Sequence, residues 1–245
     1  MFVPEKIKIS NPRTELTDDQ IRQMAMIAVN YFPDEQFLEA VVRHHAGQAD
    51  TIRLAMEQDR IVGFSIASKY RLMTPFYPRP VNVLYQRMLY LKPGFLYRGI
   101  GLLLLSLTLK DLFGWLWPFK RFAAFCRTQN PVVARLMDMY SVSYPHYDQP
   151  VPEDVREFAE GLLPLVGAES LDQKFRLAGT LDAFSGMDYT EIWNRYLRRR
   201  NNQYEKLMLS SAFEQKDGRV INSGAFVLMI AYAKPLNFVR YLLRV

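Results

Sequence analysis

Apolar and polar residues alternate along the chain with periods that predict an ordered series of strands and helices. Thr17-Asp18-Asp19-Gln20 has the spacing of a helix capping box, and Gln58-Asp59-Arg60 separates two strand-like runs as a hairpin turn would. Up to residue 91 we expect a strand at 6–9, helices at 17–31 and 35–45, strands at 51–57 and 61–67, a proline-rich loop at 74–80 and a strand at 81–91.

The second half of the chain continues this alternation until a proline-rich break near residue 145. Asn130-Pro131 is a typical helix start, because proline lacks only an N–H that the first turn leaves unused. We expect a helix from residue 100, a strand at 121–127, a helix from 131, helices at 153–163 and 188–209, and strands at 212–216 and 223–233 flanking Asp217-Gly218. The order of elements predicts an α/β or α+β fold with a sheet of mixed direction.

Three segments are expected on this basis. Residues 1–145 would form the core domain, and residues 146–210 a mostly helical insertion. Residues 211–245 would supply C-terminal strands and a short helix that complete the sheet.

Composition limits the class of protein. The chain has 245 residues, 49% of them hydrophobic, which suffices for a packed core. Its net charge of +6 indicates an anionic partner: a nucleotide cofactor, an acidic carrier protein, nucleic acid or a lipid surface. The single cysteine, Cys126, excludes an internal disulfide and a cysteine-rich zinc site and fits a reducing, cytoplasmic location. No metal is expected.

No targeting or spanning segment is evident in the sequence. The first residues, MFVPEKIKIS, lack a continuous apolar stretch of the kind that signal peptides contain. The most apolar window, residues 100–118, carries Lys110 and Asp111 in its middle, and both are costly inside a bilayer. A buried helix is therefore expected there.

The turn before this helix carries the main functional signal. The sequence FLYRGIG places Gly99 and Gly101 where a helix begins, although each glycine inside a helix costs about 1 kcal/mol relative to alanine. Unpaired N–H groups and the helix dipole at this end favour an anion, and Arg98 would add charge. A phosphate site and a tight turn with close helix–strand packing both explain the glycines.

The wider sequence YLKPGFLYRGIG resembles the acyl-CoA-binding motif of the GNAT N-acetyltransferase superfamily. Tyr90, Leu91 and Pro93 match the strand end of that motif, and Gly99 and Gly101 match its small positions. Leu96 replaces the usual Gln or Arg, and Tyr97 stands where glycine is common. DRIVGF at 59–64 and NPVVARLMDMYSV at 130–142 resemble two further family segments, although Met137 replaces a frequent tyrosine and Ser141-Val142 a Gly-Phe pair.

The resemblance implies a fold and a cofactor. The fold would be a mixed, mostly antiparallel sheet flanked by helices, with two strands parting beside coenzyme A and one of them at 81–91. The cofactor would be acetyl-CoA or another acyl-CoA. Its predicted contacts are Tyr90 and Leu91 on the strand, the backbone of Leu96, Tyr97, Arg98, Gly99, Ile100 and Gly101, and Asn130.

The same resemblance implies acyl transfer to an amine that attacks the thioester directly. The main-chain amide of Leu91 would hold the oxyanion, and Tyr140, one helical turn beyond Met137, would serve as the acid in place of the missing tyrosine. Two alternatives stay open: a non-catalytic acyl-CoA-binding module, and an N-acyltransferase with a long-chain donor on CoA or an acyl-carrier protein. The acceptor and the oligomeric state are not readable from the sequence.

Other candidate groups have structural explanations that compete with functional ones. Asp138 and Asp148 are interpreted as surface charge and Cys126 as a buried thiol. The arginines at 195–200 are expected on a solvated helix face, with no nucleic-acid motif beside them. Trp115, Trp117 and Phe119 would pack against the insertion, line a pocket for a long acyl chain, or rest on a membrane surface.

Overall fold

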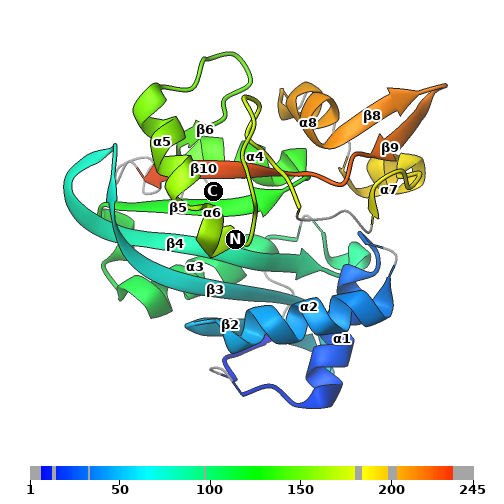
Figure 1. The fold of residues 1–245 in the computed structure, drawn as a ribbon. Helices are drawn as coiled ribbons and strands as arrows, with labels where there is room; N and C mark the ends of the chain where they lie inside the picture. Colours follow the sequence, from blue (N-terminus) through cyan, green and yellow to red (C-terminus); the bar gives the residue numbers. More distant parts are fainter. Residues whose placement is uncertain are drawn as a thin grey trace. The chain divides into compact units, whose positions relative to one another are not determined.

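The computed structural model describes residues 7–12, 15–32, 34–96, 98–179, 184–197 and 203–233. These residues form a mixed α/β fold with a largely antiparallel sheet flanked by helices, as the sequence predicted (Figure 1). Two compact units can be distinguished. Unit 1 contains the described residues up to Tyr70 and those of Leu84–Lys120, and unit 2 contains Arg71–Val83 and the described residues from Arg121 onward.

Unit 1 has its strands in the order β1-β2-β3-β4. The turn between β2 and β3 has two residues, Gln58 and Asp59, both with positive φ (47° and 64°), as a tight hairpin requires. The elements are β1 (Ile7–Ser10), α1 (Asp18–Ala28), α2 (Glu35–Gly47), β2 (Thr51–Glu57), parts of β3 (Arg60–Thr74) and β4 (Tyr77–Leu91), the 3-10 turn η1 (Pro93–Phe95), α3 (Ile100–Phe113) and the 3-10 turn η2 (Trp117–Phe119).

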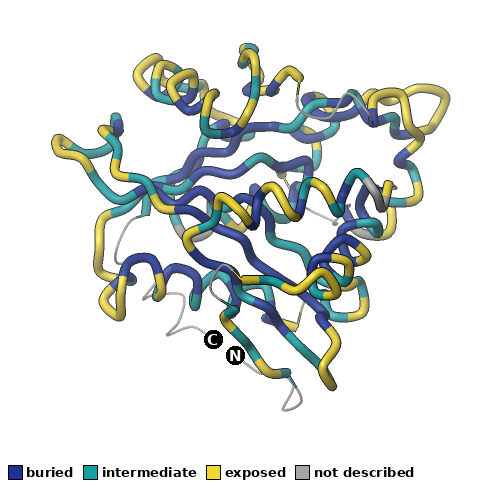
Figure 2. Tube along the Cα trace, turned by 60° about the horizontal axis from the view of Figure 1, so that its bottom comes forward, coloured by how far each residue is buried: buried dark blue, intermediate teal, exposed yellow. Residues whose placement is uncertain are grey.

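Both faces of this sheet are covered by helices. Neighbouring residues of a strand point to opposite faces, and in β3 Ile61 joins the core beneath α1 and α2 while Val62 packs against Ile100 and Leu104 of α3. The capping box predicted at Thr17 is present at the start of α1. Figure 2 shows buried strands between helices that are exposed on their outer sides.

An ion pair fixes α3 against β2. The Asp111 carboxylate accepts two hydrogen bonds from the Arg53 guanidinium, and in one of them Arg53 Nε lies 2.6 Å from Asp111 Oδ2. It accepts a third from the Thr51 hydroxyl at 3.2 Å. About one turn earlier in α3, the Thr108 hydroxyl lies 3.0 Å from the Ser65 hydroxyl of β3, in the core. Asp111, one of the two charged residues that argue against a spanning helix, thus holds α3 against the sheet. Among the described residues, no helix combines the length and the apolarity needed to cross a bilayer.

Unit 2 is built around β10, which pairs antiparallel with β5, β6 and β7. Met229 lies opposite Cys126, and Ala231 opposite Ser143. Its elements are β5 (Phe122–Thr128), α4 (Pro131–Tyr140), β6 (Ser141–Tyr144), α5 (Glu153–Gly161), α6 (Leu163–Val166), β7 (Arg176–Leu177), α7 (Thr190–Ile192), the π-helical turn η4 (Trp193–Leu197), α8 (Tyr204–Ala212), β8 (Phe213–Lys216), β9 (Arg219–Asn222) and β10 (Phe226–Ala233).

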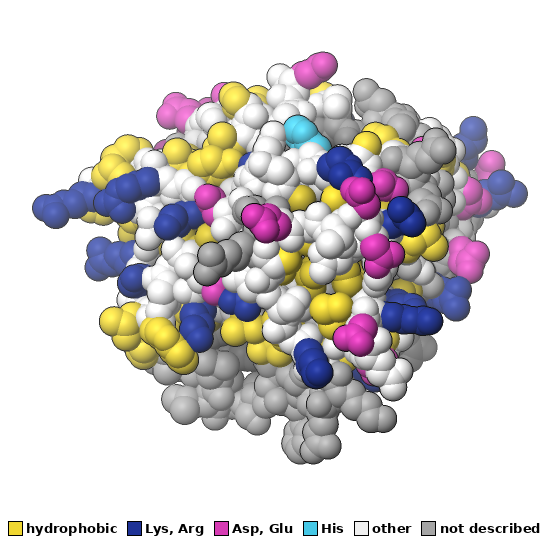
Figure 3. All heavy atoms as spheres, turned by 90° about the horizontal axis from the view of Figure 1, so that it is seen from below, with side chains coloured by type: hydrophobic (Ala, Val, Ile, Leu, Met, Phe, Trp, Pro, Cys, Tyr) yellow, Lys and Arg dark blue, Asp and Glu magenta, His cyan; other side chains and the backbone are white. Residues whose placement is uncertain are grey.

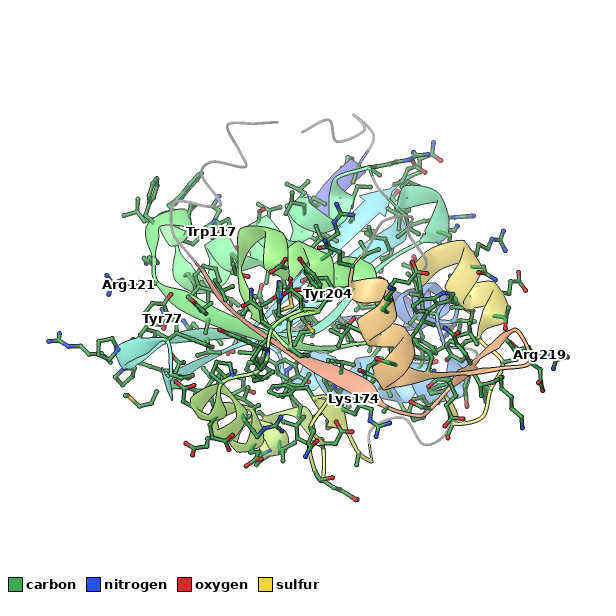
Figure 4. All side chains as sticks on the ribbon, turned by 90° about the horizontal axis from the view of Figure 1, so that it is seen from above. Tyr77, Trp117, Arg121, Lys174, Tyr204 and Arg219 are labelled. Atoms are coloured by element: carbon green, nitrogen blue, oxygen red, sulfur yellow. The ribbon has the colours of Figure 1, made fainter. Side chains whose placement is uncertain are left out.

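The prediction of a loop at 74–80 is wrong. β3 ends at Thr74 and β4 begins at Tyr77, so the turn between them has only two residues. Pro78 and Pro80 are two positions apart, so their missing N–H groups lie on the same edge of β4, and the other edge can still pair. Aromatic contacts hold the turn: the Phe76 ring stacks 4.4 Å from that of Tyr232. The Tyr77 hydroxyl donates to the Ala233 carbonyl at 2.9 Å, and Arg121 lies near the same ring (Figure 4).

Two expectations for the last third of the chain are also corrected. Among the described residues, the α-helix expected at 188–209 is only partly present: α7 covers Thr190–Ile192, η4 is π-helical, and α8 begins at Tyr204, while residues 198–202 lie outside the described part of the chain. Asp217-Gly218 forms a tight turn between β8 and β9, whereas β10 is a separate strand that pairs elsewhere. The final helix expected near the C-terminus lies outside the described residues.

We predict that Asp111→Asn weakens the fold of unit 1. The substitution removes the carboxylate that faces Arg53, whose side chain is only 15% exposed, and a lost charge-assisted hydrogen bond costs about 1.5–3 kcal/mol. Urea unfolding of the intact chain measures the change. Asp18→Asn, which breaks an exposed pair with Arg43, is the control and should leave the midpoint unchanged. Equal midpoints for both variants would contradict the tether.

Candidate functional site: the turn between β4 and α3

The turn after β4 starts from a peptide group that is held on both sides. The N–H of Lys92 donates to the Val62 carbonyl at 2.8 Å, and the carbonyl of the same peptide, that of Leu91, accepts from the Tyr31 hydroxyl at 2.9 Å. Tyr31 is a residue whose role the sequence analysis missed, because it comes from the turn after α1, sixty residues earlier. The two bonds fix the direction in which the chain leaves the sheet.

A glycine in β3 permits this approach. A Cβ built on Gly63 would lie 2.3 Å from Leu91 Cδ2, so the Leu91 side chain would have to move, and 3.2 Å from the Tyr90 carbonyl oxygen, which is tighter than most real contacts. The glycine of DRIVGF therefore lets the Leu91 side chain pack directly against β3. Tyr90 in turn packs its ring against those of Tyr31 and Phe64, at 5.4 and 5.7 Å.

The start of α3 presents backbone N–H groups without a capping side chain. Gly99 is the N-cap residue and adopts a left-handed conformation, φ +75°, which explains why glycine stands there. The first bond of the helix runs from the Leu103 N–H to the Gly99 carbonyl at 3.0 Å. The N–H groups of Ile100, Gly101 and Leu102 precede this bond and have no acceptor within the helix. Together with the helix dipole they favour an anion.

Gly101 distinguishes the two explanations that the sequence left open. A Cβ built on it would lie 3.4 Å from Leu91 Cδ1, close to ordinary van der Waals contact, and no positive φ requires glycine there. Packing therefore does not demand a glycine at this position. A ligand that approaches the backbone at the first turn would demand it.

Cationic side chains surround the turn. Arg98 is exposed, and its guanidinium carbon lies 5.3 Å from the centre of the Phe95 ring. A cavity of about 460 Å³ adjoins the turn and is lined by Glu57, Gln58, Arg60, Ile61, Val62, Lys92 and Phe95. Within the described residues, no three side chains are placed to hold a metal ion.

The predicted cofactor residues of this turn contribute unequally. Ile100 is fully buried, so only its backbone is available, whereas Leu91 and Leu96 are half-buried. Tyr97 lies outside the described residues. Because Leu96 has no polar atoms in its side chain, any contact that it makes with an anion is through its backbone.

The candidate residues of unit 2 have mostly structural roles. The Asn130 side chain caps α4 by accepting a hydrogen bond from the Val132 N–H at 2.9 Å. Tyr140 ends α4, and its side chain lies outside the described part of the chain. The sulfur of Met137 accepts from the Cys126 thiol at 3.5 Å, and burial raises the pKa of that thiol to about 12. A thiol in this state is a poor nucleophile.

Unit 2 also contains a polar cluster around Asp138 and Asp148, the two residues that the sequence analysis interpreted as surface charge. The His146 ring lies between two carboxylates, with Nδ1 bonded to Asp148 and Nε2 3.4 Å from Asp138. The Ser143 hydroxyl lies 3.2 Å from the Tyr204 hydroxyl and 3.4 Å from Asp138. Burial raises the pKa of Tyr204, labelled in Figure 4, so its phenol stays protonated at neutral pH. The cluster joins α4, β6 and α8.

Comparison with known proteins gives similarity at the level of solved structures. The sequence matches no protein-family model and no curated protein. A protein of Pyrococcus horikoshii is 18% identical, with a TM-score of 0.43, over 54% of this chain and 85% of its own. A putative GNAT-family acetyltransferase of Desulfovibrio desulfuricans is 15% identical, with a TM-score of 0.38, over 71% of this chain and 92% of its own.

An aminoglycoside N-acetyltransferase in complex with CoA is 18% identical, with a TM-score of 0.34, over 43% of this chain and 70% of its own. Several of the similar structures carry the name of the family that the sequence motifs resemble. At such identities and TM-scores the similarity assigns neither an activity nor a residue role to this chain. Its function is therefore argued from its own residues.

We predict that Cys126 resists alkylation while the protein is folded. At pH 8 a thiol with a pKa near 12 has a thiolate fraction about three orders of magnitude below that of a free thiol, and the sulfur is also buried. Mass spectrometry after iodoacetamide treatment should show slow modification of the folded chain and rapid modification in urea. The folded rate should also keep rising above pH 9. A folded rate within tenfold of the unfolded one would contradict this assignment.

Proposed function

We propose that the chain is an acyltransferase that takes its acyl group from acyl-CoA, acetyl-CoA by default, and transfers it to an amine. The observation that carries this proposal is the start of α3, where three uncapped N–H groups adjoin a glycine that packing does not require. A diphosphate fits this arrangement because it accepts several hydrogen bonds and carries negative charge. The sequence resemblance to acyl-CoA-binding motifs supplies the cofactor class.

The residues around the turn would share the binding of the cofactor. The N–H groups of Ile100, Gly101 and Leu102 would hold the diphosphate, and Arg98 would add charge from the exposed side of the turn. Because these contacts are mainly to the backbone, the replacement of the usual Gln or Arg by Leu96 weakens the site without abolishing it.

The chemistry of the proposed reaction places two demands on the protein. Bound acyl-CoA supplies the acyl group as a thioester, and the Leu91 N–H is proposed to hold the thioester oxygen as charge develops on it. An alkyl ammonium acceptor with a pKa near 10.4 must also lose a proton, which costs about 4.6 kcal/mol at neutral pH. Tyr140 as the acid for the leaving thiolate stays a prediction.

A non-catalytic acyl-CoA-binding module is the second candidate. One observation favours it: Met137, at the position of the family's frequent tyrosine, directs its sulfur at the buried Cys126 thiol and supplies no proton. Turnover separates the two candidates. Release of free CoA from acetyl-CoA in the presence of a broad amine panel supports the enzyme, whereas CoA binding without turnover supports the module.

We predict that Gly101→Ala weakens CoA binding without harming the fold. The added methyl group would enter the space beside the first-turn N–H groups, and alanine is the better helix former by up to about 1 kcal/mol. Isothermal calorimetry with CoA should show at least a tenfold loss of affinity, and urea unfolding should show unchanged or higher stability.

Gly47→Ala is the matched control, because Gly47 is also helical and has open space around it, at the end of α2. It should bind CoA as the parent chain does. Unchanged affinity of Gly101→Ala would contradict the proposed diphosphate site, and so would a parent chain that does not bind CoA.

A further inference from the structure

The segment after α3 exposes three large apolar side chains within five residues. Trp115, Leu116 and Phe119, called here the aromatic loop, are 78%, 65% and 63% exposed. The other large apolar residues that are exposed in the described part of the chain stand singly: Met26, Met73, Leu136 and Met187. Neither Trp115 nor Phe119 is therefore part of the core of unit 1.

The aromatic loop is an ordered structure with its own anchor. Gly114 ends α3 with φ +82°, and its N–H donates to the Lys110 carbonyl at 2.8 Å. The Trp117 N–H then donates to the Gly114 carbonyl, and the Phe119 N–H to the Leu116 carbonyl, both at 3.0 Å. The Trp117 side chain, labelled in Figure 4, is only 7% exposed and fixes the loop to unit 1.

Three lysines lie around this loop. Lys110 Nζ lies 3.6 Å from the centre of the Trp115 ring, and Lys69 Nζ and Lys120 Nζ donate to the last carbonyls of α3, those of Leu112 and Phe113. Residues 112–121 contain no acidic side chain.

The nearby carboxylates are already bonded within the protein. Asp111 is paired with Arg53, and Asp50 accepts a hydrogen bond from the Lys69 backbone N–H. On the face shown in Figure 3, cationic and anionic side chains alternate, so the net charge alone does not define a binding surface there. At the aromatic loop, in contrast, exposed apolar groups and cations occur together.

The size and charge of this surface select one kind of partner. Large apolar side chains bury at most about 250 Å² each, so these three fall short of the roughly 800 Å² per partner that a stable protein interface needs. Insertion into a lipid headgroup region requires no matching surface, and lysines beside it are attracted by anionic lipids. Tryptophan is also enriched at membrane interfaces.

We propose that the aromatic loop docks the protein on an anionic lipid surface, with Trp115, Leu116 and Phe119 inserted among the headgroups and the lysines against the phosphates. Docking would place the protein beside donors or acceptors that carry long apolar chains. The proposal is independent of CoA binding, so either can fail without the other.

The protein carries its own reporter for this test. Of its three tryptophans, Trp117 and Trp193 are buried, so a change in emission on adding vesicles reports on Trp115. With vesicles of equal parts phosphatidylglycerol and phosphatidylcholine, we expect co-sedimentation, a blue shift of the emission and protection from acrylamide. Vesicles of phosphatidylcholine alone, or added salt, should weaken binding at least tenfold.

The variant Leu116→Glu/Phe119→Glu retains Trp115 and should lose at least tenfold in binding to the anionic vesicles. Met26→Glu places one such negative charge on an exposed apolar position of α1, and it should bind as the parent chain does. Urea unfolding should give both variants the midpoint of the parent chain, which verifies that they are folded.

Several results would overturn the proposal. One is that the parent chain and the double variant bind vesicles equally well, or that Met26→Glu loses as much vesicle binding as the double variant does. Another is protection of Trp115 from acrylamide without vesicles, which would mean that the chain itself covers the loop. A third is self-association in analytical ultracentrifugation that the double variant abolishes, which would assign the surface to a second copy.

Discussion

One peptide group, between Leu91 and Lys92, sets the geometry on which the candidate site depends. Its N–H is bonded to β3 through Val62, and its carbonyl is bonded to the segment after α1 through the Tyr31 hydroxyl. Gly63 leaves room for the Leu91 side chain, which would have to move if a Cβ were present there. With the end of β4 held in this way, the turn through η1 and Gly99 delivers the first N–H groups of α3 to a defined place beside the sheet.

The other end of α3 completes this arrangement and gives unit 1 a second feature. The Asp111–Arg53 pair and the buried Ser65–Thr108 contact fix the helix along β2 and β3, so its N-terminus cannot shift without breaking these polar contacts. The same tether neutralises the acidic residue nearest the aromatic loop. As a result, one helix presents uncapped backbone N–H groups at its start and a cationic, apolar surface after its end.

The sequence predicted the local features well because each depends on neighbouring residues. The capping box at Thr17, the Gln58-Asp59 turn, the helix start at Pro131 and the interruption of the apolar window by Asp111 are all local signals. Features that depend on distant contacts were missed. Nothing near Phe76 indicates that β10 would pack against it and convert a proline-rich loop into a hairpin, and nothing near His146 indicates that the Tyr204 ring of α8 would lie against it. The same limit applies to Tyr31, whose partner is sixty residues away.

The central claim is that the backbone amides at the start of α3 bind a diphosphate. NMR of the ¹⁵N-labelled protein, titrated with CoA and separately with inorganic pyrophosphate, tests this directly. The account predicts that the amide resonances of Ile100, Gly101 and Leu102 shift with both ligands and show the largest changes in unit 1. Binding of CoA that leaves these three resonances in place, while others move, would contradict it.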